Sequence, residues 1–130
     1  MPRTTVMPKT LDFQPRPTYP YSPGAKGGGL VFTAGQVAWD ATGYVTGIGD
    51  VRAQTEQTLR NVIAVLEEAG ASLDDVLKCN VYLKDMNDFQ IMNEEFAKVF
   101  PDRPPARTTV QTPLAEPEML VEIEVDARVS

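Results

Sequence analysis

The chain has 130 residues, of which 42% are hydrophobic and 23% are charged. This length and composition predict one domain that buries a hydrophobic core of its own. With no histidine and a single cysteine, the sequence excludes a Ser-His-Asp triad, a Cys-His dyad, an intramolecular disulfide and a metal site made of histidines or paired cysteines.

The charge balance and the apolar pattern narrow the class of protein further. Twelve Lys and Arg residues against eighteen Asp and Glu residues give a formal net charge of −6, which disfavours a broad nucleic-acid-binding surface. No apolar stretch has the length of a membrane span, and residues 1–14 lack the apolar region of a secretory signal. We therefore expect a cytoplasmic protein with no membrane and no nucleic-acid partner.

The first 28 residues are rich in proline and contain six of the eleven prolines of the chain. Because proline cannot donate to a β-ladder, residues 1–15 are predicted to form a flexible N-terminal arm, which precedes a single domain over residues 16–130. The glycine-rich residues 24–29 predict a hairpin turn that leads into a short apolar strand over residues 30–35. A second turn is expected at residues 40–43.

Residues 51–69 have a helical periodicity of apolar side chains. Asp50 stands at the N-cap position, and Gly70 follows the last periodic residue, where a left-handed C′ glycine is expected. The predicted apolar face consists of Leu59, Val62, Ile63, Leu66 and Ala69.

A strand and a second helix follow. Residues 76–83 alternate between apolar and polar side chains, which predicts a half-buried strand with Cys79 in the core. The second helix is predicted to begin after a cap at Asn87 or Asp88 and to end at Phe100, because Pro101 cannot continue it. Its predicted inward side chains are Phe89, Met92, Phe96, Val99 and Phe100.

The strongest period-two pattern lies at residues 119–127. One face of this predicted strand is apolar, and the other carries Glu122, Glu124 and Asp126. The predicted order of elements is strand, strand, helix, strand, helix, strand, strand, which indicates an α+β fold with both helices on one face of the sheet. The other face stays half polar, and this favours oligomerisation.

Six sequence blocks occur in order: residues 20–23 (PYSP), 30–36 (LVFTAGQ), 81–89 (VYLKDMNDF), Asn93, 105–110 (PARTTV) and 121–125 (VEIEV). Together they resemble the reactive intermediate deaminase A (RidA) family, also called the YjgF/UK114 family, over residues 19–129. The resemblance implies a chorismate-mutase-like (ferredoxin-like) protomer with a mixed β-sheet. It also implies a homotrimer with a central β-barrel and with active sites in the clefts between subunits.

The resemblance implies an enzyme that needs no metal and no organic cofactor. Family members hydrolyse reactive 2-imino and enamine acids, such as 2-iminobutanoate and 2-iminopropanoate, to 2-keto acids and ammonia. They thereby limit metabolite damage by intermediates that leak from pyridoxal-phosphate dehydratases. Two alternatives remain open: the same fold acting on another enamine, of the aminomuconate type, or a non-enzymatic trimer that binds and senses small carboxylates.

The family's site residues map onto matching positions of this chain. The arginine that binds the substrate carboxylate corresponds to Arg107, whose guanidinium fork suits a carboxylate. The glutamate that holds the hydrolytic water corresponds to Glu122, although Glu124 points to the same face and the spacing alone does not choose between them. The cleft residues correspond to Tyr21 and Asn93.

Three further positions are expected at the substrate. Gly35 would allow close approach of the backbone to the ligand. Ala34 stands where the family often has a serine, and Thr109 stands where it often has a cysteine, so Thr109 would contribute its backbone N–H. Because both departures fall in the pocket, we expect the substrate preference to have shifted.

Overall fold

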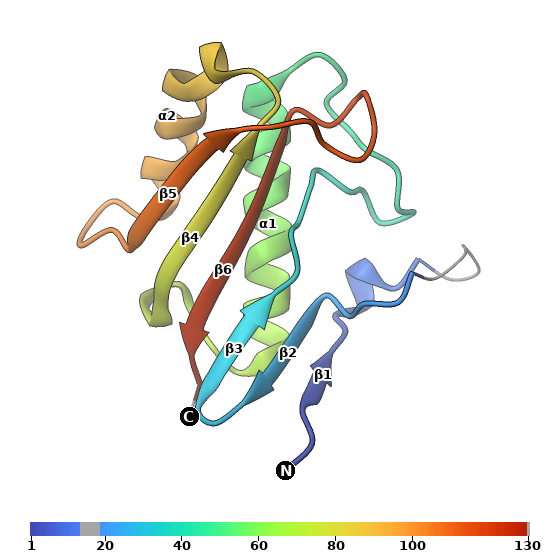
Figure 1. Ribbon diagram of the computed structural model, residues 1–130, viewed down its shortest axis with the longest axis vertical. Coiled ribbons are helices and arrows are strands. Elements are labelled where there is room, and N and C mark those ends of the chain that lie inside the picture. Colours follow the sequence, from blue (N-terminus) through green and yellow to red (C-terminus); the bar gives the residue numbers. More distant parts are fainter. Residues whose placement is uncertain (14–18, 130) are drawn as a thin grey trace.

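A mixed β-sheet forms one layer of the protein, and two α-helices cover one of its faces in the computed structural model (Figure 1). Within the described residues, 1–13 and 19–129, the sheet has six strands in the order β1-β2-β3-β6-β4-β5. The strands are β1 (Thr4–Val6), β2 (Gly24–Gly27), β3 (Leu30–Thr33), β4 (Val76–Leu83), β5 (Ala106–Gln111) and β6 (Val121–Arg128). The helices are α1 (Val51–Ala69) and α2 (Phe89–Val99).

Helix α1 has the bounds that the sequence predicts, because its capping signals are local. The Asp50 carboxylate accepts a hydrogen bond from the Ala53 N–H, and Gly70 adopts a φ of 87°, in the left-handed region. The apolar face is shifted slightly from the predicted one: Val65 is fully buried, whereas Ile63 is half-buried. Gln54 and Asn61 are also buried on α1, and their side-chain amides donate hydrogen bonds to the backbone carbonyls of Glu118 and Val37.

The hairpin between β2 and β3 differs from the prediction for residues 24–29. Gly24–Gly27 is itself a strand paired with β3, and the turn contains only Gly28 and Gly29. Both glycines have positive φ, 59° and 79°, as a two-residue hairpin loop with the twist of the sheet requires. The glycine content therefore predicted the turn correctly but did not indicate the strand that precedes it.

The N-terminal segment belongs to the sheet. Within the predicted arm of residues 1–15, Thr4–Val6 pairs antiparallel with β2 as an edge strand, and Leu11 is buried in a short 3-10 helix (Lys9–Leu11). The proline-rich pattern does not predict this strand, because Thr4–Val6 lies between Pro2 and Pro8 and contains no proline of its own. Residues 14 and 15 lie outside the described residues.

Helix α2 begins at Phe89, after a 3-10 turn (Met86–Asp88), so its start differs from the prediction in detail. Asp85 caps the 3-10 turn by accepting a hydrogen bond from the Asn87 N–H, and Asp88 makes no side-chain cap. Phe89, predicted to face inward, has 37% of its surface exposed.

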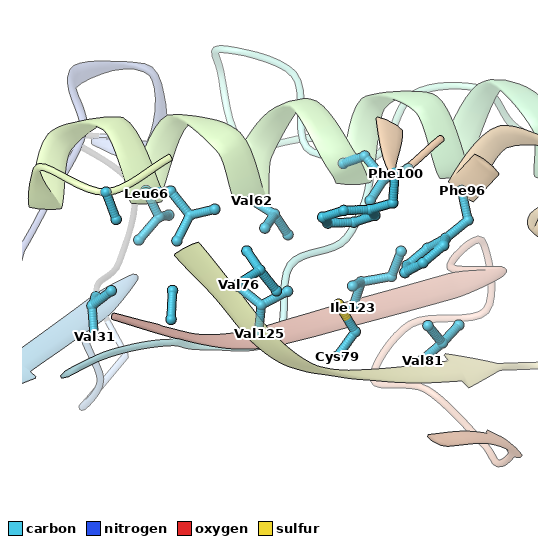
Figure 2. Packing of buried hydrophobic residues seen from close by; sticks show 14 of the residues in the cluster. Val31, Val62, Leu66, Val76, Cys79, Val81, Phe96, Phe100, Ile123 and Val125 are labelled. Atoms are coloured by element: carbon cyan, nitrogen blue, oxygen red, sulfur yellow. The ribbon is translucent and has the colours of Figure 1, made fainter. Parts of the chain in front are cut away.

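The core lies between the helices and the inner face of the sheet (Figure 2). Ile123 and Val125 of β6 alternate with the carboxylates of that strand, and Cys79 of β4 is fully buried beside them, as predicted. Burial raises the pKa of the Cys79 thiol to about 12, so this cysteine packs as a small apolar side chain. The opposite, outer face of the sheet has no helix over it in Figure 1.

Candidate active site

A pocket of about 400 Å³ opens beside the end of β3 and the start of β6. The segment that follows β3 contributes Gly35, Gln36, Val37 and Trp39 to its wall, and β6 contributes Glu122. The N-terminal part of the chain closes it with Met7, Leu11, Phe13, Tyr19 and Tyr21. Three of the residues predicted for the site, Tyr21, Gly35 and Glu122, thus come together although they are far apart in sequence.

Glu122 lies on the outer face of β6 and is half-buried at the pocket wall. Burial raises the pKa of its carboxyl above the usual value, and the nearby negative charge of Glu124 raises it further. A carboxylate with such a pKa accepts a proton from water more readily than an ordinary surface glutamate does.

Gly35 is the residue against which the Glu122 side chain packs. A Cβ added at Gly35 would lie 2.7 Å from Cδ of Glu122 and would also overlap one of its carboxylate oxygens. The absence of a side chain at this position therefore allows the Glu122 carboxylate to occupy its place in the pocket. The backbone here is fixed, because Gln36 exchanges two hydrogen bonds with Ile123, at 2.8 and 2.9 Å.

Tyr21 lies at the open side of the pocket, with 59% of its surface exposed. Its ring stacks on Tyr19, with ring centroids 6.4 Å apart. Burial raises the pKa of the Tyr21 hydroxyl, and the charge of Glu122, which lines the same pocket, raises it further. Tyr21 therefore keeps its proton at neutral pH and can donate a hydrogen bond.

Glu124 lies outside the pocket wall and accepts a hydrogen bond from a neighbouring strand. The Tyr82 hydroxyl donates to Oε1 of Glu124 at 2.5 Å, and this bond raises the pKa of Tyr82 to about 12. Glu124 does not line the pocket, whereas Glu122 does. The structure thus distinguishes two carboxylates that the alternation of β6 left equivalent.

Arg107 lies elsewhere, on the inner face of the edge strand β5. Its guanidinium carbon is 4.8 Å from the ring centroid of Phe96 and 5.7 Å from that of Phe89, and Nη1 contacts the Met92 sulfur at 3.9 Å. Within the described part of the chain, no carboxylate forms an ion pair with Arg107. Burial lowers the pKa of this arginine, which nevertheless stays charged at neutral pH.

Asn93 and Thr109 accompany Arg107 rather than Glu122. Asn93 lies four residues after Phe89 and three before Phe96, so it shares their side of α2. Its Oδ1 is buried and has no hydrogen-bond partner among the described residues. Thr109 lies two residues after Arg107 and therefore on the same face of β5.

The predicted site residues thus form two groups on opposite faces of the sheet. In the register of the sheet, Arg107 pairs with Cys79, which faces the helices, whereas Glu122 pairs with Tyr82 on the outer face. Two neighbouring residues of a strand point to opposite faces, and β4 separates β5 from β6. The Arg107 and Glu122 of one chain therefore do not share a cavity.

Ala34, also predicted for the site, lies next to the pocket rather than in its wall. Ala34 is half-buried between β3 and Gly35, its N–H donates to the Pro23 carbonyl, and its side chain is not part of the pocket wall. No group of three or more potential metal-ligating side chains occurs in residues 1–13 and 19–129. In the same residues no helix has the length and apolar character to cross a membrane.

Sequence reasoning assigned no role at the site to four aromatic residues. Trp39 and Phe13 form part of the pocket wall, with ring centroids 5.7 Å apart, and Phe89 and Phe96 hold the Arg107 guanidinium. The spacing of Phe89, Asn93 and Phe96 at i, i+4 and i+7 was a signal for the second group. No local signal connects Phe13 with Trp39, because their contact depends on tertiary packing.

Comparisons with known proteins identify the family and similar folds. The model of a family described as endoribonuclease L-PSP matches residues 12–129. A RutC family protein of Pyrococcus horikoshii is 47% identical over 114 residues, which cover 87% of this chain and 90% of the relative. The 3-aminoacrylate deaminase RutC of Acinetobacter baylyi is 35% identical over 129 residues, with 99% and 100% covered. A crystal structure of RidA from an Antarctic Psychrobacter superposes with a TM-score of 0.84, at 35% identity, over 97% of this chain and 99% of that chain.

Proposed function

The chain belongs to the family described as endoribonuclease L-PSP, the RidA/YjgF/UK114 family, and from this premise we propose that it is a hydrolytic deaminase of reactive 2-imino and enamine acids. The substrates that we propose are small 2-imino acids such as 2-iminobutanoate and 2-iminopropanoate. The products are the 2-keto acid and ammonia.

The observation that carries the proposal is the set of contacts around the Arg107 guanidinium. Its guanidinium is held by two aromatic rings and lacks a carboxylate partner in the described part of the chain, and the buried Oδ1 of Asn93 on the same side of α2 lacks a donor. A preoriented, unpaired guanidinium is a receptor for the carboxylate of an amino-acid-derived substrate. Thr109 follows on the same face, and we assign its backbone N–H as a further donor.

Glu122 activates the water in this proposal. The carboxylate accepts a proton from water as the water oxygen attacks C2 of the imine, which gives a carbinolamine. Glu122 passes this proton, and then the proton of the carbinolamine hydroxyl, to the nitrogen; the C–N bond breaks, ammonia leaves and C2 becomes the carbonyl of the keto acid. General-base catalysis of this kind contributes about 10²–10⁴-fold, and the raised pKa of Glu122 suits it to the task.

The separation of Arg107 from Glu122 supports an active site shared between two copies of the chain. One copy would supply the pocket with Glu122, Tyr21 and Gly35, and its neighbour would supply Arg107, Asn93 and Thr109. A head-to-tail contact of this kind is heterologous, and heterologous contacts generate a ring where the rotation between neighbouring copies closes. We propose that the ring is a homotrimer in which the outer faces of the sheets form the central barrel.

The relatives support the reaction class more strongly than the exact substrate. The Acinetobacter baylyi relative is named for 3-aminoacrylate, an enamine acid. Another enamine therefore remains the second candidate substrate. Ribonuclease activity, which the description of the family model names, lacks support in this chain because the 130 residues contain no histidine and carry a net charge of −6.

The test measures the release of keto acid from 2-iminobutanoate and 2-iminopropanoate. The imines are generated in situ by an amino-acid oxidase, and semicarbazide competes for them. We expect Glu122→Gln to lower kcat/KM by about 10²–10⁴-fold. Arg107→Ala should lower it by about 10–150-fold, since a charge-assisted hydrogen bond contributes about 1.5–3 kcal/mol. Arg107→Lys keeps the charge but loses the planar fork, so most of this loss should remain.

Three other results of this test would contradict parts of the proposal. A folded wild-type protein that accelerates neither imine, nor 3-aminoacrylate, contradicts the deaminase proposal. Tight binding of keto acids without turnover would instead indicate a sensor of small carboxylates. Loss of activity in Glu122→Gln together with unchanged activity in both Arg107 variants would contradict the role of Arg107.

A further inference from the structure

The pocket beside Glu122 continues into an apolar region. At the Glu122 side, the wall contains Gly35, Gln36 and the ring of Tyr21. Elsewhere the wall includes the polar residues Asp12 and Glu116 and several apolar side chains that no part of the proposed hydrolysis requires, namely Met7, Leu11, Phe13, Trp39 and Met119. These side chains belong to segments distant in sequence, so the apolar region is a product of the fold.

Most of the apolar wall is held in place, although Met7 has 48% of its surface exposed. The ring of Trp39 packs on that of Phe13 at a tilt of 58°, and the backbone carbonyl of Trp39 accepts hydrogen bonds from the Gln57 and Asn61 side chains of α1, each at 3.1 Å. Leu11 and Met119 are nearly fully buried, with 5% and 3% of their surface exposed. A wall of fixed aromatic and aliphatic groups binds an apolar group without a large loss of side-chain entropy.

The size of the pocket exceeds what a four-carbon acid needs. Its volume of about 400 Å³ lies within the range of pockets that bind drug-sized molecules, which is about 300–1,000 Å³. In the proposed site, C2 of the substrate lies beside Glu122, and the substrate carboxylate points toward Arg107 of a neighbouring copy. Only the side chain of the substrate then remains to be placed. The apolar region is the part of the pocket that remains for it.

We propose that this site prefers 2-imino acids with branched aliphatic or aromatic side chains, such as those derived from leucine and phenylalanine, and that Trp39 and Phe13 determine the preference. The inference rests on the proposed deaminase function and names the substrate class within it. Burial of apolar groups favours larger substrates by roughly fourfold per methylene.

The experiment compares kcat/KM for the imines of alanine, leucine and phenylalanine on the same protein preparation, after subtraction of the uncatalysed rate. We expect the wild-type protein to prefer the leucine imine over the alanine imine by at least about tenfold. Phe13→Ala and Trp39→Leu should each reduce that ratio by about threefold or more, because each removes apolar contacts that a larger side chain makes and a methyl group does not. A ratio of two rates is independent of the fraction of folded protein, so partial unfolding of a variant does not imitate the effect.

Tyr44→Leu is the matched control, because Tyr44 is an aromatic residue with 63% of its surface exposed and does not line the pocket. This variant should keep the wild-type ratio. Equal or faster turnover of the alanine imine by the wild-type protein overturns the inference but leaves the deaminase function intact. A preference that survives in both pocket variants overturns the assignment to Trp39 and Phe13. Absence of turnover with every imine overturns the proposed function and the inference together.

Discussion

Glu122 is half-buried in the pocket wall and lies near the negative charge of Glu124. Burial and the charge of Glu124 both oppose its ionisation, so the pKa of its carboxyl is raised. A general base must be deprotonated to act, and kcat/KM therefore falls as the pH drops through this pKa. We expect the fall on the acid side to begin at a higher pH than an ordinary glutamate, with a pKa near 4.3, would produce.

Glu124→Gln tests this electrostatic coupling. Removal of the neighbouring negative charge eases the ionisation of Glu122, so its pKa falls and the acid limb of the pH profile of kcat/KM moves to lower pH. The amide oxygen of glutamine can still accept the Tyr82 hydrogen bond. Asp126→Asn is the control, since it removes the same charge from the same face of β6 but lies two residues farther along the strand from Glu122 than Glu124 does. Equal shifts in the two variants would contradict a specific effect of Glu124.

Gly35→Ala tests the packing of the glutamate. The new Cβ would meet Cδ of Glu122 at 2.7 Å, so the carboxylate must leave its position. We expect kcat/KM to fall by about 10²-fold, as for a displacement of about 1 Å, with little change in Tm because a flexible side chain moves. Gly27→Ala is the control, because a Cβ there meets nothing within 4 Å, and it should keep wild-type activity. Wild-type activity in Gly35→Ala would show that the observed place of the carboxylate is not needed.

At the scale of elements, α1 depends on its caps as well as on its packing. Asp50 satisfies a backbone donor of the first turn, and the Gly70 N–H bonds the carbonyls of the last turn. The helix also fixes the pocket wall, because Gln57 and Asn61 bind the carbonyl of Trp39. The stability of α1 and the shape of the pocket are thereby linked.

Asp50→Ala should destabilise the protein by about 1 kcal/mol, through loss of the hydrogen bond to the Ala53 N–H, and lower Tm by about 3–5 °C. Thermal unfolding followed by circular dichroism at a fixed protein concentration measures the change. Asp50→Asn keeps an equally good cap and should retain the wild-type Tm within about 1 °C. If both variants lose the same amount, the charge at this position matters rather than the cap.

At the scale of the whole molecule, the sheet itself separates the two groups of site residues. Arg107 lies on the inner face of an edge strand and Glu122 on the outer face of β6, so a site that needs both requires two copies of the chain. This arrangement would make activity dependent on assembly. It also predicts that two inactive variants can complement each other.

Arg107→Ala and Glu122→Gln, unfolded together and refolded as an equal mixture, should recover about one quarter of the wild-type activity, because that fraction of interfaces combines an intact arginine with an intact glutamate. Each variant refolded alone is the control and should keep only its own reduced activity, about 10–150-fold below wild type for Arg107→Ala and about 10²–10⁴-fold below it for Glu122→Gln. Native mass spectrometry reports whether mixed oligomers form. Mixed oligomers without recovered activity would contradict a shared site.

The sequence by itself predicted the features that depend on near neighbours in the chain. The bounds and caps of α1, the two-face alternation of β4 and β6, the burial of Cys79 and the α+β class all follow from periodicity and from capping residues. Family motifs then named the candidate site residues, of which the pocket brings together Tyr21, Gly35 and Glu122.

Strand pairing, the surroundings of each carboxylate and the face on which each site residue lies were decided only by the tertiary structure. These features depend on contacts between segments far apart in the chain. Strand pairing made β2 a strand where glycines indicated a turn, and it brought Thr4–Val6 into the sheet. The hydrogen bond from Tyr82 distinguished Glu124 from Glu122. The register of β4, β5 and β6 placed Arg107 and Glu122 on opposite faces of the sheet. Successive side chains of a strand point to alternate faces, and tertiary packing fixes which face meets the helices.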